Sequence, residues 1–132
     1  MITIDSEAIR LITLFENLTG ASVKDCIIEG DTVYFLMEEG MMGRAIGKNG
    51  RNVKRVERMI GKNIKLFEFS EDIKTFTKRV IPYAIQIDVN KDCVEVKVNK
   101  VYRPVVIGRD GRNVEILRKI FKRNFGVDIK IR

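Results

Sequence analysis

The sequence predicts an α+β protein in which one small unit occurs twice. The first observation is a repeat, because residues 46–53 (Ile-Gly-Lys-Asn-Gly-Arg-Asn-Val) return as residues 107–114 (Ile-Gly-Arg-Asp-Gly-Arg-Asn-Val). Six of the eight positions are identical, and the other two exchange Lys for Arg and Asn for Asp. The second observation is that helix-like and strand-like patterns surround both copies in the same order. We therefore interpret the 132 residues as a duplication.

The first half begins with a helix that Ser6 is expected to cap and Gly20 to end. Two strand-like runs follow, Val23–Ile28 and Thr32–Met37, with a hairpin turn signal between them. The further elements expected here are a short helix over Met41–Ile46, the glycine loop, a helix from Arg51, and a strand over Ile64–Phe69.

The second half repeats this order. Ser70 is expected to cap a helix that Pro82 ends, and Pro104 fits the first turn of a short helix. The expected strands are Ala84–Val89, Cys93–Asn99 and Val127–Ile131, and the expected helices are a short one over Arg103–Ile107 and one about a turn longer after the second loop. Each unit reads α-β-β-α-loop-α-β, and the expected domains are residues 1–69 and 70–132. Units this small bury little surface alone, and no low-complexity linker separates them, so we expect a rigid pair.

The positive charge lies in two blocks. Residues 41–67 carry 8 basic and 1 acidic side chains, and residues 101–132 carry 9 and 3, whereas residues 1–40 carry 2 and 8. Both basic blocks contain a glycine motif. A face that binds a polyanion explains this segregation, and a basic face that serves only solubility is the alternative.

Several classes of function are disfavoured by the composition. The chain has no histidine, and its two cysteines, Cys26 and Cys93, lie far apart, so a zinc site is not expected. Both thiols are expected to be reduced and to lie on strands in or near the core. We find no signal peptide and no apolar run near 18 residues, so we expect a cytoplasmic protein without a membrane partner. No cofactor is expected.

The glycine loop has the chemistry of a phosphate site. Its two glycines allow a tight turn and close approach of a phosphodiester to the main chain. The helix that begins at Arg51 or Arg112 directs its free N–H groups and its dipole toward the loop. Lys48 and Arg109 add positive charge on the same rim. For a single copy, an ordinary helix–helix turn is the simpler reading, but here the pattern occurs twice within basic blocks.

Both loops match the Ile-Gly-x-x-Gly signature of KH domains, and the order of elements resembles the type II, or prokaryotic, KH arrangement. Residues 45–53 are similar to the loop of the transcription factor NusA, and the two-unit layout resembles the archaeal NusA-like proteins. The resemblance implies two tandem type II KH domains that bind single-stranded RNA, each loop clamping four nucleotides. It further implies a role in transcription termination or antitermination, with RNA polymerase or the elongation complex as a further partner.

The residues expected to bind RNA combine this resemblance with the loop chemistry. They are Arg44, Ile46, Gly47, Lys48, Asn49, Gly50, Arg51 and Lys54 in the first unit and Ile107, Gly108, Arg109, Asp110, Gly111 and Arg112 in the second. By resemblance, the groove that holds the bases would be lined by Ile46, Val53, Ile64 and Leu66, and by Ile107, Val114, Ile129 and Ile131, although these side chains are equally suited to the core.

The chain departs from the family pattern in two ways. Bacterial NusA also has a polymerase-binding domain and an oligonucleotide-binding barrel, for which this sequence has no room, so contact with polymerase would need another surface. Asp110 stands where a neutral or basic residue would suit a phosphate. The seven Phe and three Tyr are not clustered as a stacking platform, which disfavours an RRM-like reader.

Two rival functions remain from sequence. An NTPase is disfavoured, because Gly43–Asn49 only approximates a P-loop: it has three residues between its glycines where four are needed, and Asn in place of the magnesium-binding Ser or Thr. No catalytic residue is expected. An RNA-binding role in ribosome assembly or RNA decay would use the same fold and is not separated from transcription by the sequence.

Overall fold

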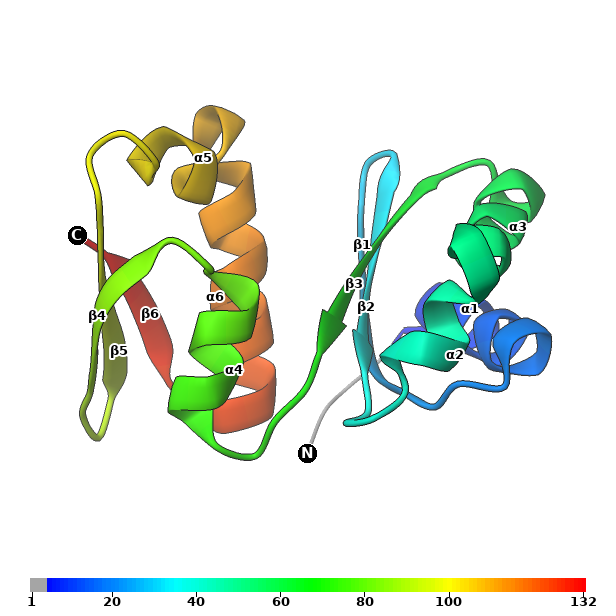
Figure 1. Ribbon diagram of the computed structural model, residues 1–132, viewed down its shortest axis with the longest axis horizontal. Coiled ribbons are helices and arrows are strands. Elements are labelled where there is room, and N and C mark those ends of the chain that lie inside the picture. Colours follow the sequence, from blue (N-terminus) through cyan, green and yellow to red (C-terminus); the bar gives the residue numbers. More distant parts are fainter. Residues whose placement is uncertain (1–4) are drawn as a thin grey trace. The chain divides into compact units, whose positions relative to one another are not determined.

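The computed structural model describes residues 5–132, which form two compact units, one ending at Ser70 and the other beginning at Glu71. Residues 1–4 of the expected first domain lie outside the described residues. In each unit, a three-stranded sheet has its helices on one face (Figure 1). The chain is thus a mixed α+β protein.

The first unit places the glycine loop between two parallel strands. Its elements are α1 (Ser6–Thr19), β1 (Val23–Glu29), β2 (Thr32–Met37), α2 (Met42–Ile46), the 3₁₀ turn η1 (Lys48–Gly50), α3 (Arg51–Ile60) and β3 (Asn63–Glu68). β1 and β2 form an antiparallel hairpin, and β2 pairs in parallel with β3 from Thr32↔Asn63 to Met37↔Glu68. Because parallel strands need a crossover, α2, η1 and α3 together carry the chain from β2 back to the start of β3.

The second unit has the same order and the same pairing. Its elements are α4 (Ile73–Val80), β4 (Ala84–Val89), β5 (Cys93–Val98), α5 (Arg103–Ile107), the 3₁₀ turn η2 (Arg109–Gly111), α6 (Arg112–Phe125) and β6 (Asp128–Ile131). β4 is antiparallel to β5, and β5 is parallel to β6. α6 has 14 residues against 10 in α3, which agrees with the expected extra turn.

Aromatic side chains form the centre of each core. Phe15 of α1 and Phe35 of β2 are both fully buried and stack with their ring centroids 4.5 Å apart. In the second unit, Phe76 of α4 and Phe121 of α6 meet at 5.4 Å. Alternate residues of the central strands complete these cores, because side chains two apart share one face of a sheet; the buried ones include Val33, Met37, Val94, Val96 and Val98.

Two predicted helix caps are wrong, one by one residue and the other by two. Asp5, not Ser6, caps α1, and its side chain accepts a hydrogen bond from the Ala8 amide at 2.8 Å. Asp72, not Ser70, caps α4, where it accepts from the hydroxyl and the amide of Thr75. These two bonds, the hydroxyl's first, lower the pKa of the Asp72 carboxyl. In both helices the residue that precedes the first turn is an Asp, whose carboxylate also interacts favourably with the positive end of the helix dipole.

The cysteines lie on strands, as predicted. Cys26 of β1 is buried and Cys93 of β5 is half-buried, and burial raises the pKa of the Cys93 thiol. Within residues 5–132, no helix combines the length and the apolar character that crossing a membrane would need.

Candidate nucleic-acid interface

The first glycine loop has a backbone that ordinary residues rarely adopt. Gly47 has φ 73° and ψ 175°, and Gly50 has φ 73° and ψ 15°. Between them, Asn49 has φ 57°, a left-handed conformation that Asn and Asp tolerate best. The Gly50 amide donates to the Gly47 carbonyl at 3.2 Å, so the loop is a closed turn.

The second loop repeats these dihedral angles within a few degrees. Gly108 has φ 80° and ψ 170°, Asp110 has φ 55°, and Gly111 has φ 73° and ψ 13°. The Gly111 amide donates to the Gly108 carbonyl, again at 3.2 Å. The change from Asn49 to Asp110 therefore alters the charge of the loop but not its backbone.

An asparagine in the first turn of the next helix holds each loop in place. Asn52 Nδ2 donates to the Arg44 carbonyl at 2.7 Å, and Asn113 Nδ2 donates to the Val106 carbonyl at 2.7 Å. These bonds tie the helix after the loop to the helix before it. A β-carbon at Gly47 would lie 2.7 Å from Asn52 Cγ, and one at Gly108 would lie 2.7 Å from Asn113 Cβ. The first glycine is thus required for packing as well as for its dihedral angles.

The helices that follow the loops begin without a side-chain cap. Gly50 is the N-cap of α3 and Gly111 is the N-cap of α6, and neither has a side chain to accept from the first amides. The Arg51 amide donates to the Lys48 carbonyl and the Arg112 amide to the Arg109 carbonyl, so the amides available to an anion are those that follow in the first turn, together with the helix dipole. The first turn of α3 contains no acidic residue, whereas that of α6 contains Glu115.

Exposed cations surround both loops. None of the following five forms an ion pair with another residue of the described chain: Lys48, Arg51, Lys54, Arg109 and Arg112. Lys54 lies over the first loop, since its Cε would be 3.5 Å from a β-carbon at Gly50. Unpaired cations and uncapped amides are the groups that bind phosphate oxygens in proteins.

Not every predicted residue lies at the loop. Arg44 of α2 extends toward the end of α1, where its Nη1 lies 3.5 Å from the Gly20 carbonyl. Ile46, which precedes the loop, is 38% exposed, while Ile129 is fully buried. Ile64 and Leu66 are half-buried and pack against the first core. Among the expected groove residues, Ile129 is therefore a core residue, and Ile46 is the one most accessible to a base.

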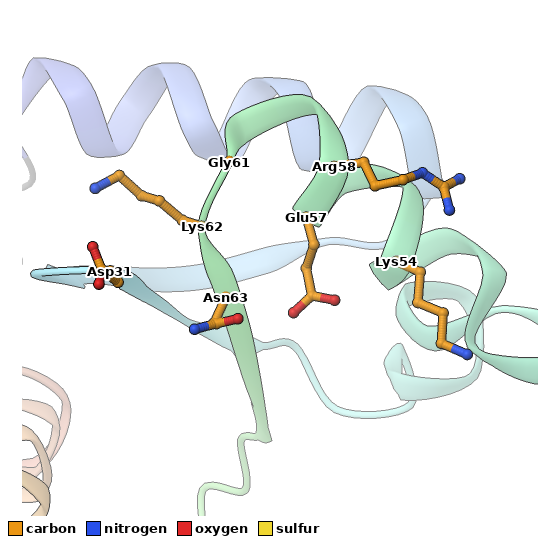
Figure 2. Close-up of a pocket in the computed structure, with 7 residues that line it drawn as sticks. All are labelled: Asp31, Lys54, Glu57, Arg58, Gly61, Lys62 and Asn63. Atoms are coloured by element: carbon orange, nitrogen blue, oxygen red, sulfur yellow. The ribbon is translucent and has the colours of Figure 1, made fainter.

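A surface pocket of about 590 Å³ lies beside α3 and the start of β3 (Figure 2). Its lining residues are Asp31, Lys54, Glu57, Arg58, Gly61, Lys62 and Asn63. Glu57 points across the pocket toward the strand, and its Oε2 accepts from the Ile64 amide at 2.9 Å. Since β3 is the edge of its sheet, this bond occupies one of the strand's outward donors. The corresponding position in α6 is Arg118, which pairs with Glu115 at 3.1 Å instead.

Comparisons with known proteins agree on one family. A family model described as KH domain matches residues 10–80, more than half of the chain. The probable transcription termination protein NusA of Methanocaldococcus jannaschii is 35% identical over 130 residues, which cover 93% of this chain and 70% of that protein. The protein of the same name from Methanococcus vannielii is 38% identical over 137 residues, covering 98% and 79%. The crystal structure of APE1850 matches with a TM-score of 0.81 and 33% identity over 98% of this chain and 100% of that chain.

The chain belongs to the archaeal NusA-like family of KH proteins. The resemblance seen in the sequence is thereby confirmed.

The repeated motif marks one further position of the KH loop, which was not among the predicted site residues. Asn52 and Asn113 are identical in the two copies of the motif, yet neither was expected to have a role at the site. An asparagine repeated at the first turn of both helices, where a helix gains little from Asn itself, indicates a side-chain bond to the neighbouring backbone. Glu57 and its bond to the strand edge had no such signal, because Arg118 replaces it in the second copy.

We expect Gly47→Ala to damage the KH loop more than Gly50→Ala does. Gly50 has left-handed angles that cost Ala about 1–2 kcal/mol, whereas the angles of Gly47 are essentially confined to glycine and its β-carbon would overlap Asn52. The measurements are thermal unfolding and titration with single-stranded RNA. The control is Asn52→Ala, which removes the overlapping side chain: Gly47→Ala should cost less stability in that background than in the native one. Equal costs in both backgrounds would show that the contact is unimportant.

Proposed function

We propose that this protein is an RNA-binding NusA-type factor that grips single-stranded RNA through two KH loops and acts in transcription termination. The observation that carries the proposal is the loop itself: a closed Gly-x-x-Gly turn, followed by an uncapped helix and rimmed by unpaired cations. This arrangement offers backbone donors and mobile charge to a phosphodiester.

The proposal includes a second KH domain over residues 70–132, after a first over residues 1–69. Supporting it are the common element order, the common strand pairing and the nearly identical loop angles of the two units. The family match ends at residue 80, so it does not itself extend to the second loop. That the two domains form a rigid pair stays a prediction.

The biological setting is also part of the proposal. The relatives are named as transcription termination proteins, which favours transcription over ribosome assembly or RNA decay and a binding factor over an enzyme. Antitermination, a contact with RNA polymerase or the elongation complex, and a cytoplasmic location are parts of the same proposal that come from the NusA resemblance.

The two loops differ in their charge. Residues 48–54 contain three cations and no acid, whereas the equivalent residues 109–115 contain two cations and two acids. The differences are Asn49 against Asp110 and Lys54 against Glu115. Glu115 also pairs with Arg118 at 3.1 Å, and Arg118 lies 3.7 Å from Asp128 as well, so this cation is engaged within its own unit. We therefore propose that the first unit holds the RNA backbone more tightly than the second.

Binding is expected to favour single strands and to weaken with salt. At four nucleotides for each loop, two loops cover roughly eight nucleotides. Neutralising about 4–6 phosphates would give a log–log salt slope of roughly −3 to −4 for a single strand. Titrations of single-stranded and duplex RNA at several salt concentrations measure both properties. A preference for duplex RNA, or affinity that is independent of salt, would contradict the proposal.

The loop charge can be reversed without changing its backbone. In the variant Lys48→Asp with Asn49→Asp, two carboxylates would face the phosphate, and Asp is compatible with the angles because Asp110 has them in the second loop. We expect RNA affinity to fall by at least tenfold while the melting temperature changes little. The matched control is Asn90→Asp with Lys91→Asp, the same exchange in the β4–β5 turn, which should bind like the native protein. If the folded loop variant retains its RNA affinity, the loop is a turn between helices that does not contact the RNA backbone.

Exchanging charges between the loops tests which of them holds the RNA backbone more tightly. A carboxylate about 5 Å from a phosphate, at an effective dielectric of 20–80, costs on the order of 1–3 kcal/mol before screening. Asp110→Asn and Glu115→Lys should therefore each raise affinity several-fold at low salt. The reciprocal changes, Asn49→Asp and Lys54→Glu, should lower it by more, because they act on the tighter loop. If the substitutions at 110 and 115 leave affinity unchanged or weaken it, the ranking is wrong.

A further inference from the structure

Two tyrosines from distant parts of the second unit stack on each other at the surface. The ring centroids of Tyr83 and Tyr102 are 4.3 Å apart and the ring planes are inclined by 9°. Tyr83 lies in the turn between α4 and β4, and Tyr102 lies directly before α5. The side chains are 42% and 43% exposed, so the stack is open to solvent. The expectation that the tyrosines do not cluster is wrong for this pair.

The backbone next to the stack is held in a defined turn. Asn99 Oδ1 accepts from the Val101 amide at 3.0 Å, and the Asn99 carbonyl accepts from the Tyr102 amide at 3.0 Å. This turn exposes Val101 (74%) on one side of Tyr102 and Val105 (61%) on the other. The result is a small apolar surface around an aromatic stack, which we call the tyrosine platform: Tyr83, Val101, Tyr102 and Val105.

The segment of chain that contains Val101, Tyr102 and Val105 carries only positive charges. Between Lys97 and Arg109 there are four cations and no acidic residue. Lys100 and Arg103, on either side of the Val101-Tyr102 pair, are exposed and form no ion pair with another residue in 5–132. An aromatic surface within a basic border is the combination that binds single-stranded nucleic acid, where bases stack on rings and cations meet the phosphates.

The first unit has no counterpart of this surface. Counting 61 positions back along the repeat, Tyr102 corresponds to Met41 and Tyr83 to Ser22. The adjacent pair Asn99-Lys100 corresponds to Glu38-Glu39, two acids. The platform is therefore particular to the second unit, which is also the unit with the less positive loop.

The position of the platform connects it to the second KH loop. α5 joins Tyr102 to Gly108 through only five helical residues, a rise of about 8 Å. A strand whose phosphate lies at the second loop can therefore place a neighbouring base on the stack. We propose that Tyr83 and Tyr102 form a base-stacking site for single-stranded RNA beside the second KH loop. This rests on the proposed RNA-binding function and assigns a new contact to it: the π face of a nucleobase, which any base provides.

The test compares substitutions that retain or remove the ring. The probe is end-labelled single-stranded RNA of about twelve nucleotides, longer than the roughly eight that two loops would cover. Tyr102→Leu and Tyr83→Leu keep apolar bulk but remove the aromatic face, and each should weaken binding by about 5- to 100-fold. Tyr102→Phe keeps the ring and should bind like the native protein. Tyr83 is the sharper site, because it lies outside α5 and meets that helix only through the ring of Tyr102.

A second measurement identifies the contact directly. In RNA containing 5-iodouridine at successive positions, irradiation crosslinks a base to an aromatic ring stacked on it. We expect the crosslinked peptide to contain Tyr83 or Tyr102 in the native protein and the crosslink at that site to vanish in the matching Leu variant.

The outcomes separate this inference from the proposed function. If the native protein does not bind the RNA, both fail together. If Lys48→Asp with Asn49→Asp abolishes binding while both folded Leu variants keep native affinity and no tyrosine crosslinks, the KH proposal stands and the stacking site is overturned.

Discussion

The KH loop depends on the contact between a glycine and an asparagine five residues later. Asn52 lies so close to Gly47 that no side chain fits between them, and its amide holds the end of α2. Because Asn52 belongs to the first turn of α3, this contact fixes where that helix begins and leaves its first amides facing the loop. The free donors, the close approach of a phosphate and the placement of Lys48 and Arg51 all follow from it. The second unit repeats the contact with Gly108 and Asn113.

The two units share this loop backbone and differ in the side chains around it. Beside the loop, the first unit has Lys54 where the second has Glu115. At the position whose side chain binds the strand edge in the first unit, Glu57 is replaced by Arg118 in the second. The second unit instead has exposed aromatic and apolar side chains before its loop. Since a positive charge serves contact with an RNA backbone and an exposed ring serves contact with a base, the two units offer different kinds of contact to RNA.

Much of this organisation could be predicted from the sequence because the repeat carries it. The copied octapeptide located both loops, and the alternating and helical patterns gave the order of elements, with Thr32–Met37 and Arg103–Ile107 matching the observed bounds. The caps were misplaced because Ser6 and Ser70 lie next to carboxylates, and only the three-dimensional hydrogen bonds decide between such neighbours. The Tyr83–Tyr102 stack could not be predicted, because the β4–β5 hairpin separates the two residues in sequence. The direction of Arg44 likewise depends on where α1 ends.

The crossover that contains each loop has a thermodynamic consequence. In both units the loop lies between two parallel strands, so it has its native shape only when those strands are paired. A parallel pair is made of distant segments and does not persist as a local fragment. The binding geometry is therefore absent from the unfolded chain, and any ligand of the loop must bind the folded state alone. By linkage, RNA at a hundred times its dissociation constant would add about 2.7 kcal/mol to the stability of the fold. In a domain of this size that is a large share of the total, so the protein is most firmly folded while it holds RNA.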